Sequence, residues 1–344
     1  MTIEKRPFGH TKTGEEVELY TLKDGGCVVE VITYGAAIRS IEIPVAGGKR
    51  DVALGFDDIE GYENNKSYHG AVIGRIGNRV ANATYTMDAK TYKLDVNDGP
   101  NSLHGGFIGF DKQVWSGAQE HGALVLTLID KEGTAAGYPG DLEAKVKYTL
   151  ENGELGIEYT ATCSKDTPIN MTNHCYFNLA GHNAGGIEKH KIQIFSHKIT
   201  AVDDTLIPTG ELMDVTDTPL DLRELTEIEP GLNQENRQME LGGGYDHNWV
   251  LSGDAHRDLA MASVLECDGL SMTCLTTKPG IQFYSGNMMA GETGKGGAVY
   301  GKRTGLCLET QYFPNAINTP QFPAPILKKG EVYNHKTVYR FREV

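Results

Sequence analysis

Apolar and polar residues alternate with a period of two along much of this chain. Within 141–150 the even positions are apolar, and the odd positions between them are mostly charged. This alternation is typical of a β-strand with one buried face. The pair Asn152-Gly153 then favours a tight turn, because both central residues of a type I′ turn need positive φ. Alternation resumes over 155–161, so we predict a β-hairpin over 141–161.

Short segments of the same kind recur along the sequence, whereas no amphipathic helix of about twelve residues stands out. The further predicted strands are 27–32, 37–43, 84–87, 124–129, 192–195, 271–276, 305–311 and 337–341. Many strands separated by Gly, Pro, Asn and Asp favour an all-β protein, an antiparallel sandwich or barrel. No Ser/Gly linker, charge block or internal repeat divides the chain. We therefore expect one domain over residues 1–344.

Composition narrows the class of partner. The chain has 42 glycines in 344 residues, which suits many turns between strands, and a formal net charge of -14. That charge argues against nucleic acid as a partner, because such binding depends on clustered Lys and Arg. The sequence shows neither a signal peptide nor an apolar stretch long enough to span a membrane. We therefore expect a soluble, cytoplasmic protein that does not associate with membranes.

The six cysteines show neither a C-x-x-C pair nor the spacing of a metal site. Most lie within apolar, strand-like segments. We expect them to be reduced structural thiols, although spacing alone leaves a disulfide between distant cysteines open.

Candidate chemistry lies in three polar segments that are far apart in the sequence. They are 101–106, with His104, 172–178, with His174, and 309–315, with Glu309. Imidazole and carboxylate are the side chains most often used as general acids and bases. If the three segments meet in the fold, they could exchange protons with one bound molecule.

Strand alternation says more about two of these residues. From Ile169 onward the odd positions are mostly apolar, which places His174 and Tyr176 on a polar face of a strand. Glu309 points away from the face of Leu306 and Leu308, and the aromatic residues after it should desolvate its carboxylate. Desolvation would raise the pKa of Glu309 and make it a stronger base, provided that no cation offsets the effect.

Simpler interpretations stay open for each residue taken alone. His174 could be held in a structural hydrogen-bond network, and Glu309 could be an exposed glutamate at a sheet edge. Arg75 and Arg79, in the Gly-rich segment 74–79, could be a solvated pair. The histidines and Glu309 lack the spacing of a local zinc motif, so we expect no metal.

Several segments together resemble the aldose 1-epimerase (galactose mutarotase) family. The match is collinear, specific and spans nearly the whole chain. It rests on 74–79 (GRIGNR), 101–106 (NSLHGG), 172–181 (TNHCYFNLAG), 245–248 (YDHN) and 309–311 (ETQ), with further support from 137–140, 206–210 and 279–284. The resemblance implies a single large antiparallel β-sandwich, the galactose mutarotase-like supersandwich, with an open concave face that binds a sugar.

The resemblance also implies roles for individual residues. Glu309 would be the base that removes the proton from the C1 hydroxyl of a hexose, and His174 the acid that protonates the ring oxygen. His104 would position the sugar near the ring oxygen and C1. Residues that would orient the other hydroxyls are Asn78, Arg79, Tyr176, Asp246 and Gln282. No cofactor is implied. Of the two arginines in 74–79, the resemblance implies a role in the site for Arg79 rather than for Arg75.

The expected substrate is a free aldohexose such as galactose or glucose, and the expected activity is interconversion of its α and β anomers. Two alternatives remain open. One is a carbohydrate-binding or regulatory module on the same fold. The other is a glycoside hydrolase that uses Asp246 and Glu309 as its two carboxylates. The sequence does not decide the preferred aldose or the choice between monomer and homodimer.

Overall fold

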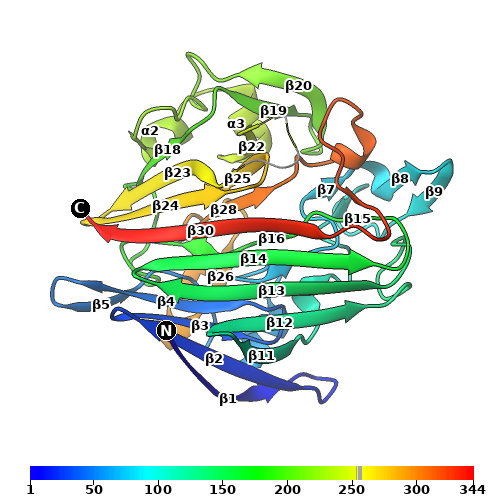
Figure 1. Ribbon diagram of the computed structural model, residues 1–344. Helices are drawn as coiled ribbons and strands as arrows, with labels where there is room; N and C mark the ends of the chain where they lie inside the picture. The colour runs from blue at the N-terminus through cyan, green and yellow to red at the C-terminus, as the bar shows by residue number, and fades with distance from the viewer. Residues whose placement is uncertain (253, 255–257) are drawn as a thin grey trace.

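The computed structural model describes residues 1–252, 254 and 258–344, and antiparallel β-strands make up most of it (Figure 1). The largest sheet has nine strands. In order across the sheet they are β11 (Ser116–Glu120), β12 (Ala123–Asp130), β13 (Leu142–Glu151), β14 (Glu154–Cys163), β30 (Tyr333–Glu343), β24 (Leu270–Thr276), β23 (Ala260–Cys267), β18 (Lys191–Ile194) and β21 (Thr226–Glu227). In Figure 1, β30, β14, β13 and β12 run across the front of the molecule.

The predicted hairpin lies in the middle of this sheet. It consists of β13 and β14, and Glu151 pairs with Glu154 at its tip. Asn152 and Gly153 have φ values of 50° and 75°, as a type I′ turn requires. The even positions of β13 are buried and most of the odd ones are exposed. The alternation in the sequence therefore identified both strands and the buried face.

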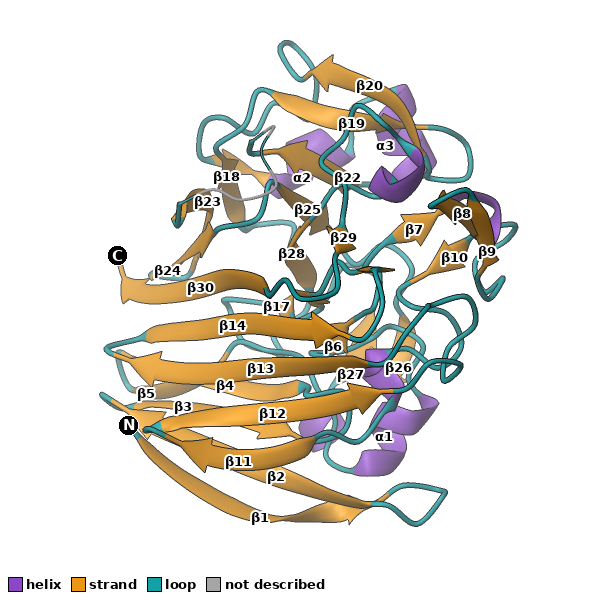
Figure 2. Ribbon diagram, turned by 45° about the vertical axis from the view of Figure 1, so that its right-hand side comes forward, coloured by secondary structure: helices purple, strands orange, loops and turns teal. Residues whose placement is uncertain are grey.

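Two smaller sheets pack against the large one. The five-stranded sheet is β1 (Thr2–His10), β2 (Glu16–Asp24), β3 (Cys27–Ile32), β4 (Ile38–Val45) and β5 (Gly48–Asp51). The six-stranded sheet is β17 (Tyr176–Phe177), β28 (Leu306–Gln311), β25 (Gly280–Tyr284), β22 (Asp246–Val250), β19 (Lys198–Val202) and β20 (Pro208–Asp214). Figure 2 shows β3 and β4 beneath β13, and β28 and β25 beside β30 and β24.

Direct hydrogen bonds join the layers. The Tyr339 hydroxyl of β30 donates to the carbonyl of Leu308 on β28 at 3.0 Å. The Tyr148 hydroxyl of β13 donates to the carbonyl of Ala36, just before β4, at 2.7 Å. Both smaller sheets thus lie on the same face of the nine-stranded sheet. One apolar core fills the space between the layers and includes Val31, Val146, Ile281, Leu308 and Phe341. The predicted antiparallel β-sandwich is confirmed.

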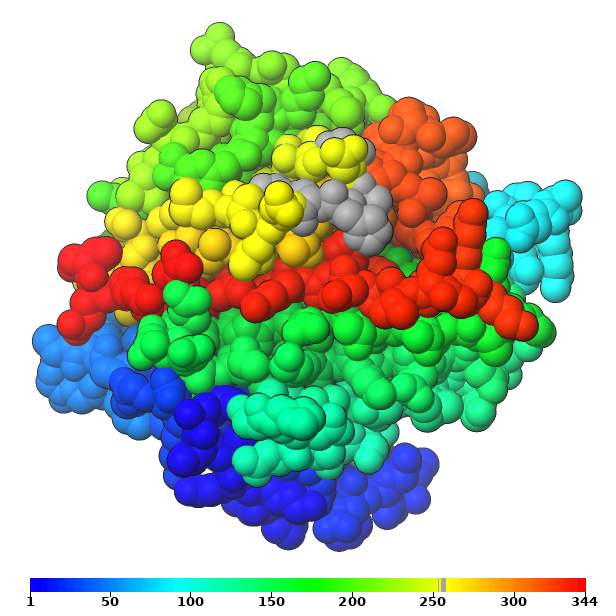
Figure 3. Space-filling view, in the orientation of Figure 1, coloured from blue at the N-terminus to red at the C-terminus, as the bar shows by residue number. Residues whose placement is uncertain are grey.

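The remaining elements are short. Two-stranded ribbons are formed by β6 (Val72–Ile73) with β16 (Thr172–Asn173), β7 (Arg79–Val80) with β10 (Ser102–Leu103), β8 (Thr84–Met87) with β9 (Lys90–Lys93), β15 (Thr167–Pro168) with β29 (Ile326–Leu327), and β26 (Ala290–Thr293) with β27 (Val299–Gly301). The helices are α1 (Ile59–Asn64), α2 (Ile228–Leu232) and α3 (Arg237–Gly242), and 3₁₀ turns occur at Ala81–Ala83, Phe110–Lys112, Lys295–Gly297 and Ala316–Asn318. In Figure 3 the β8–β9 hairpin protrudes from the side of the molecule.

Each segment predicted as a strand contains one, with ends that differ by a few residues. The α-helices have five or six residues, in agreement with the missing helical periodicity. Among the described residues, no helix has the length and apolar character needed to cross a membrane. The six cysteines are free thiols.

Candidate active site

Glu309 projects from the centre of β28, on the face opposite to the sandwich core. Its neighbours Leu306 and Leu308 belong to the core, as the alternation predicts. β28 lies between β17 and β25, and Glu309 pairs with Gln282 across the β25 ladder. The side chain of Glu309 is only 3% exposed. It is therefore a buried carboxylate in the middle of a sheet, and the interpretation as an exposed edge glutamate is wrong.

His174 lies at the point where the chain stops pairing with one strand and begins to pair with another. The alternation suggested one strand through 169–179, but the structure divides this segment into β16 and β17, with His174 between them. β16 pairs with β6, whereas β17 pairs with β28, so a single regular strand could not make both sets of hydrogen bonds. The His174 backbone is held by Gly70 and Ala71. Its Nε2 lies 3.6 Å from Oε1 of Glu309.

His104 completes a compact cluster. Its ring centroid lies 5.2 Å from that of His174, and the two rings are nearly perpendicular. The backbone N–H of Asn78 donates to His104 Nδ1 at 3.1 Å. Because a backbone amide can only donate, Nδ1 is the acceptor, and neutral His104 carries its proton on Nε2. Burial lowers the pKa of His104 well below its ordinary value, which favours this neutral form.

The pKa shifts of the acid and base candidates run in opposite directions, and burial is the main cause of both. Desolvation raises the pKa of Glu309 well above its usual value; Asp246 adds to this shift and Arg79 opposes it. Desolvation lowers the pKa of His174 to about 4. A dry site disfavours the charged form of each group. Desolvation therefore favours the state in which Glu309 is protonated and His174 is neutral.

A polar network lies next to the pair. Arg79 Nε donates to Asp98 Oδ2 at 2.7 Å, and Arg79 Nη1 lies 3.9 Å from Asp246 Oδ2. Gln282 Nε2 donates to Asp246 Oδ1 at 2.7 Å. Gln311 Nε2 in turn donates to Gln282 Oε1 at 3.1 Å. These contacts hold the donors and acceptors of the network in place before any ligand binds, which reduces the entropic cost of binding.

Most of the predicted site residues line one cavity of about 330 Å³, which lies within the size range of small-molecule sites. Those that line it are His104, His174, Glu309, Asn78, Arg79, Tyr176 and Asp246. Gln282 is buried and reaches the cavity through its hydrogen bond to Asp246. The three polar segments of the sequence therefore meet at one cavity.

Sequence reasoning missed other residues that line this cavity. They are Lys66, Ser67, Tyr68, Asp98, Leu103, Tyr284, Met288, Ala290 and Glu292. The ring of Tyr68 lies 4.7 Å from that of His104 and 5.6 Å from that of His174. The sequence around Tyr68 carries no periodic signal, so only the fold reveals it. Tyr284 pairs with Asp246 across the sheet and reaches the site in that way.

The two arginines of the Gly-rich segment separate in the structure. Arg79 lines the cavity, whereas Arg75 is 2% exposed and belongs to a different network. Its guanidinium forms an ion pair with Asp130 and donates to the carbonyls of Pro139 and Gly140. The interpretation of a solvated pair is therefore wrong, and Arg75 has a structural role.

The cluster also has the chemical make-up of a metal site. His104, His174 and Glu309 each offer one ligand atom, and these atoms lie within 4.8 Å of one another. Two imidazoles and a carboxylate are suitable zinc ligands. The sequence spacing did not indicate this arrangement, because the three ligands come from three separate segments.

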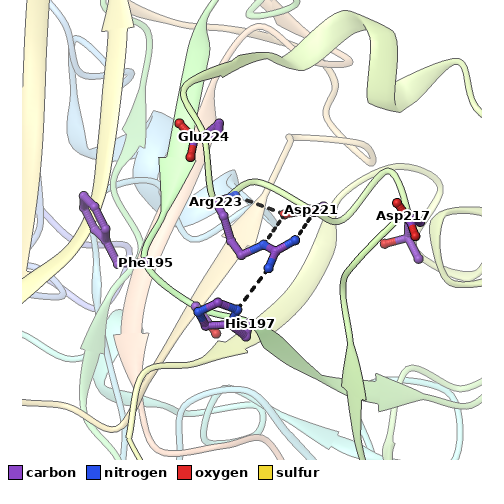
Figure 4. Close-up of a pocket in the computed structure, with 8 residues that line it drawn as sticks. Phe195, His197, Asp217, Asp221, Arg223 and Glu224 are labelled. Carbon is purple, nitrogen blue, oxygen red and sulfur yellow. Dashed lines mark hydrogen bonds and ion pairs between the residues drawn. The ribbon is translucent and has the colours of Figure 1, made fainter.

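A second depression, of about 650 Å³, lies at Phe195, His197 and Arg223 (Figure 4). In this depression Arg223 forms two hydrogen bonds with Asp221, at 2.7 and 2.6 Å, and lies 3.1 Å from His197. Arg223 and Asp221 thus neutralise each other at a partly exposed surface, and Asp217 and Glu224 also line the depression. Although this depression is larger, the buried acid and base candidates lie in the smaller cavity.

Comparison with known proteins assigns the chain to a family. The family model described as aldose 1-epimerase matches residues 18–340. The chain belongs to the aldose 1-epimerase family. It is 41% identical to the galactose mutarotase of Bos taurus over 99% of both chains, and 41% identical to that of Homo sapiens over 99% of this chain and 98% of the relative. A GalM/aldose epimerase homologue from C. elegans superposes with a TM-score of 0.86 at 27% identity, over 95% of this chain and 99% of the other.

The family assignment settles the class of activity. The protein is an aldose 1-epimerase, an isomerase that interconverts the α and β anomers of free aldoses. The aldose 1-epimerase of Escherichia coli (strain K12) is 36% identical over 95% of this chain and 96% of that enzyme. These full-length matches favour the isomerase over the binding-module and hydrolase alternatives.

Proposed function

We propose that this aldose 1-epimerase opens and recloses the ring of a free aldohexose, galactose or glucose, with Glu309 as the base and His174 as the acid. The observation that carries the proposal is the 3.6 Å separation between Glu309 Oε1 and His174 Nε2 in one buried cavity. In a cyclic aldose the hydroxyl oxygen and the ring oxygen are both bonded to C1, the anomeric carbon. Two proton-transfer groups that lie this close together can therefore serve both oxygens of one sugar.

The proposed reaction needs a Glu309–His174 pair that holds one proton at each stage. In the reactive form Glu309 is ionised and His174 is protonated. Glu309 takes the proton of the C1 hydroxyl while His174 gives its proton to the ring oxygen, and the C1–O5 bond breaks to form the aldehyde. Rotation about C1–C2 presents the other face of the carbonyl. Reclosure with the two roles reversed gives the opposite anomer and restores the starting protonation.

Burial assists this cycle, because the open-chain stage leaves Glu309 protonated and His174 neutral. These are the forms that desolvation favours, since it raises the pKa of Glu309 and lowers that of His174. Each well-placed proton-transfer group contributes about 10²- to 10⁴-fold to a rate. Two such groups suffice for a reaction that also proceeds slowly in water.

We propose that the remaining polar residues bind the sugar. His104 presents its Nε2–H as a hydrogen-bond donor close to His174, which suits a contact near the ring oxygen and C1. Asp246 and Arg79 offer an acceptor and a donor that the surrounding network holds in place. Asn78, Tyr176 and Gln282 complete the set that orients the hydroxyls.

The expected partner is a small sugar alone. A net charge of -14 disfavours a phosphate backbone as a ligand. The apolar core cluster includes residues from Tyr20 to Phe341, which supports a single domain over residues 1–344. We expect a monomer or a homodimer, and size-exclusion chromatography with light scattering would distinguish them.

Polarimetry tests the proposed activity. Freshly dissolved α-galactose should approach its equilibrium rotation faster with the protein than without it, and the same assay with α-glucose ranks the two sugars. Chelator treatment should leave the rate unchanged if the cluster acts by proton transfer alone. If the unmodified protein bound sugar but did not accelerate the change in optical rotation, this result would contradict the proposal.

A further inference from the structure

Beside the candidate site, the side chain of Asn170 forms the hydrogen bonds that a neighbouring strand would form with the backbone just after β28. The backbone N–H of Tyr312 donates to Asn170 Oδ1 at 2.9 Å, and Asn170 Nδ2 donates to the carbonyl of Tyr312 at 3.3 Å. One amide group thus satisfies both backbone groups of Tyr312, as a neighbouring strand would. The β17–β28 ladder itself pairs only Tyr176 and Phe177 with β28.

Asn170 also holds the loop that carries Asn78 and Arg79. Its Nδ2 lies 3.2 Å from the carbonyl of Gly77, to which it donates. The Gly77 N–H donates to the carbonyl of Asn170 at 2.7 Å, and the Asn170 N–H donates to the carbonyl of Arg75 at 2.7 Å. Asn170 is 1% exposed, so water does not compete for these hydrogen bonds.

These contacts join the three segments on which the reaction depends. Asn170 stands four residues before His174, Tyr312 three residues after Glu309, and Gly77 two residues before Arg79. We propose that Asn170 is a positioning residue that sets the distance between the acid and the base and aligns both with the sugar-binding loop. The inference rests on the roles proposed for Glu309 and His174. Asn170 does not touch the reacting atoms; it acts through the backbone of the segments that carry them.

The rest of the sheet does not depend on this amide. β28 stays paired with β25 through Gly280–Tyr284, and Thr310 contacts Thr337 of β30 at 2.6 Å. Removal of the amide should therefore leave β28 in its sheet while it frees the edge that faces His174. A misplacement of about 1 Å in such a site can cost about 10²-fold in rate.

The test is Asn170→Ala, assayed by polarimetry over a range of galactose concentrations. The kcat should fall by about 10- to 100-fold. KM should change by less than about threefold, because the backbone hydrogen bonds of residue 170 with Arg75 and Gly77 remain and still hold the sugar-binding loop. The matched control is Asn178→Ala. Asn178 is also buried, but its amide donates to the carbonyls of Gly185 and Thr304, away from the cavity. Both variants should have a lower Tm than the unmodified protein, and only Asn170→Ala should have a lower kcat.

Assays are run at a temperature at which circular dichroism shows both variants folded. If Asn170→Ala does not fold, Asn170→Asp replaces it: this side chain keeps an acceptor for Tyr312 and, when ionised, loses both donated hydrogen bonds, so kcat should again fall. Parent-like kcat in a folded Asn170 variant, or an equal loss in Asn178→Ala, would overturn the inference. Failure of the proposed function would show separately, as parent-like mutarotation by Glu309→Gln.

Discussion

Glu309 Oε1 lies 3.6 Å from His174 Nε2, although one residue comes from the centre of β28 and the other from the junction between β16 and β17. Burial raises the pKa of Glu309 and lowers the pKa of His174, so that the carboxyl has the higher pKa of the two. At a pH between these two pKa values the pair carries a single proton, which desolvation favours on Glu309. The proposed proton exchange with the two oxygens of the anomeric centre uses this single proton.

Glu309→Gln should abolish the base without harm to the fold. Glutamine has nearly the same shape, but its amide cannot take a proton from the C1 hydroxyl. We expect kcat to fall by about 10²- to 10⁴-fold. Oε2 of Glu309 is buried and lacks a hydrogen-bond partner among the described residues, so the free energy of unfolding should not fall by more than about 1 kcal/mol. Polarimetry and urea unfolding give the two values; equal activity in parent and variant would exclude Glu309 as the base.

His174→Asn should remove the acid. Asparagine can still form hydrogen bonds but cannot deliver a proton to the ring oxygen, so we expect kcat to fall by about 10²- to 10⁴-fold. His190→Asn is the matched control, because His190 is equally buried but accepts a hydrogen bond from Leu179 outside the cavity. The control should retain the parent kcat under conditions in which it is folded. A similar loss in both variants would point to general damage.

The pH dependence of kcat/KM follows from the single shared proton. As the pH falls through about 4, the pKa of His174, the pair takes up a second proton and no group remains to accept the C1 hydroxyl proton. As the pH rises through the raised pKa of Glu309, the pair loses its only proton and no acid remains. We expect a bell-shaped profile whose limbs belong to the pair as a unit.

The acid limb is the more informative one. An ordinary histidine titrates near pH 6.5, so activity that persists well below pH 6 would reflect the desolvated pair. Initial rates from polarimetry, corrected for the buffer-catalysed reaction at each pH, would give the profile. An acid limb near pH 6.5 would show that substrate-free His174 is not desolvated as the structure indicates.

The sequence could predict features that depend on local periodicity. Alternation identified the β13–β14 hairpin and the outward direction of Glu309. The desolvation of Glu309 was also expected, but the aromatic residues after it, Tyr312 and Phe313, pack in core clusters and do not line the cavity. Alternation also placed His174 and Tyr176 on one face, and both line the cavity, but it missed the break in the strand, because periodicity cannot show where a strand changes its pairing. The convergence of the three polar segments came from the family resemblance, since it depends on contacts between distant parts of the chain.

Residues that act through distant partners were harder to find. Asp98 has no distinctive sequence context, and Gln311 was given no role although it belongs to the 309–311 segment. Their place becomes clear only through their hydrogen bonds to Arg79 and Gln282. Asn170 stood on the predicted polar face, but its contact with Tyr312 could not be read from the sequence. These side chains form hydrogen bonds with groups that are distant in the sequence and become neighbours only in the folded chain.

Arg79→Lys should weaken sugar binding more than it slows the chemical step. The lysine keeps the charge but lacks the planar fork of the guanidinium, which contacts Asp98 at 2.7 Å and approaches Asp246 at 3.9 Å. Loss of one hydrogen bond to a charged group costs about 1.5–3 kcal/mol, so KM should rise by about 10- to 100-fold. Steady-state polarimetry separates KM from kcat; an unchanged KM would place Arg79 outside the sugar contacts.

Arg75→Met should have the opposite effect and lower stability while it leaves catalysis intact. Arg75 is buried, and its guanidinium forms an ion pair with Asp130 and donates to Pro139 and Gly140. Removal of one partner of a buried ion pair leaves an uncompensated charge, so the free energy of unfolding should fall by about 3–5 kcal/mol. Urea unfolding measures this loss. Because Arg75 is outside the cavity, the folded fraction should keep the parent KM, and a rise in KM like that of Arg79→Lys would show that both arginines serve the site.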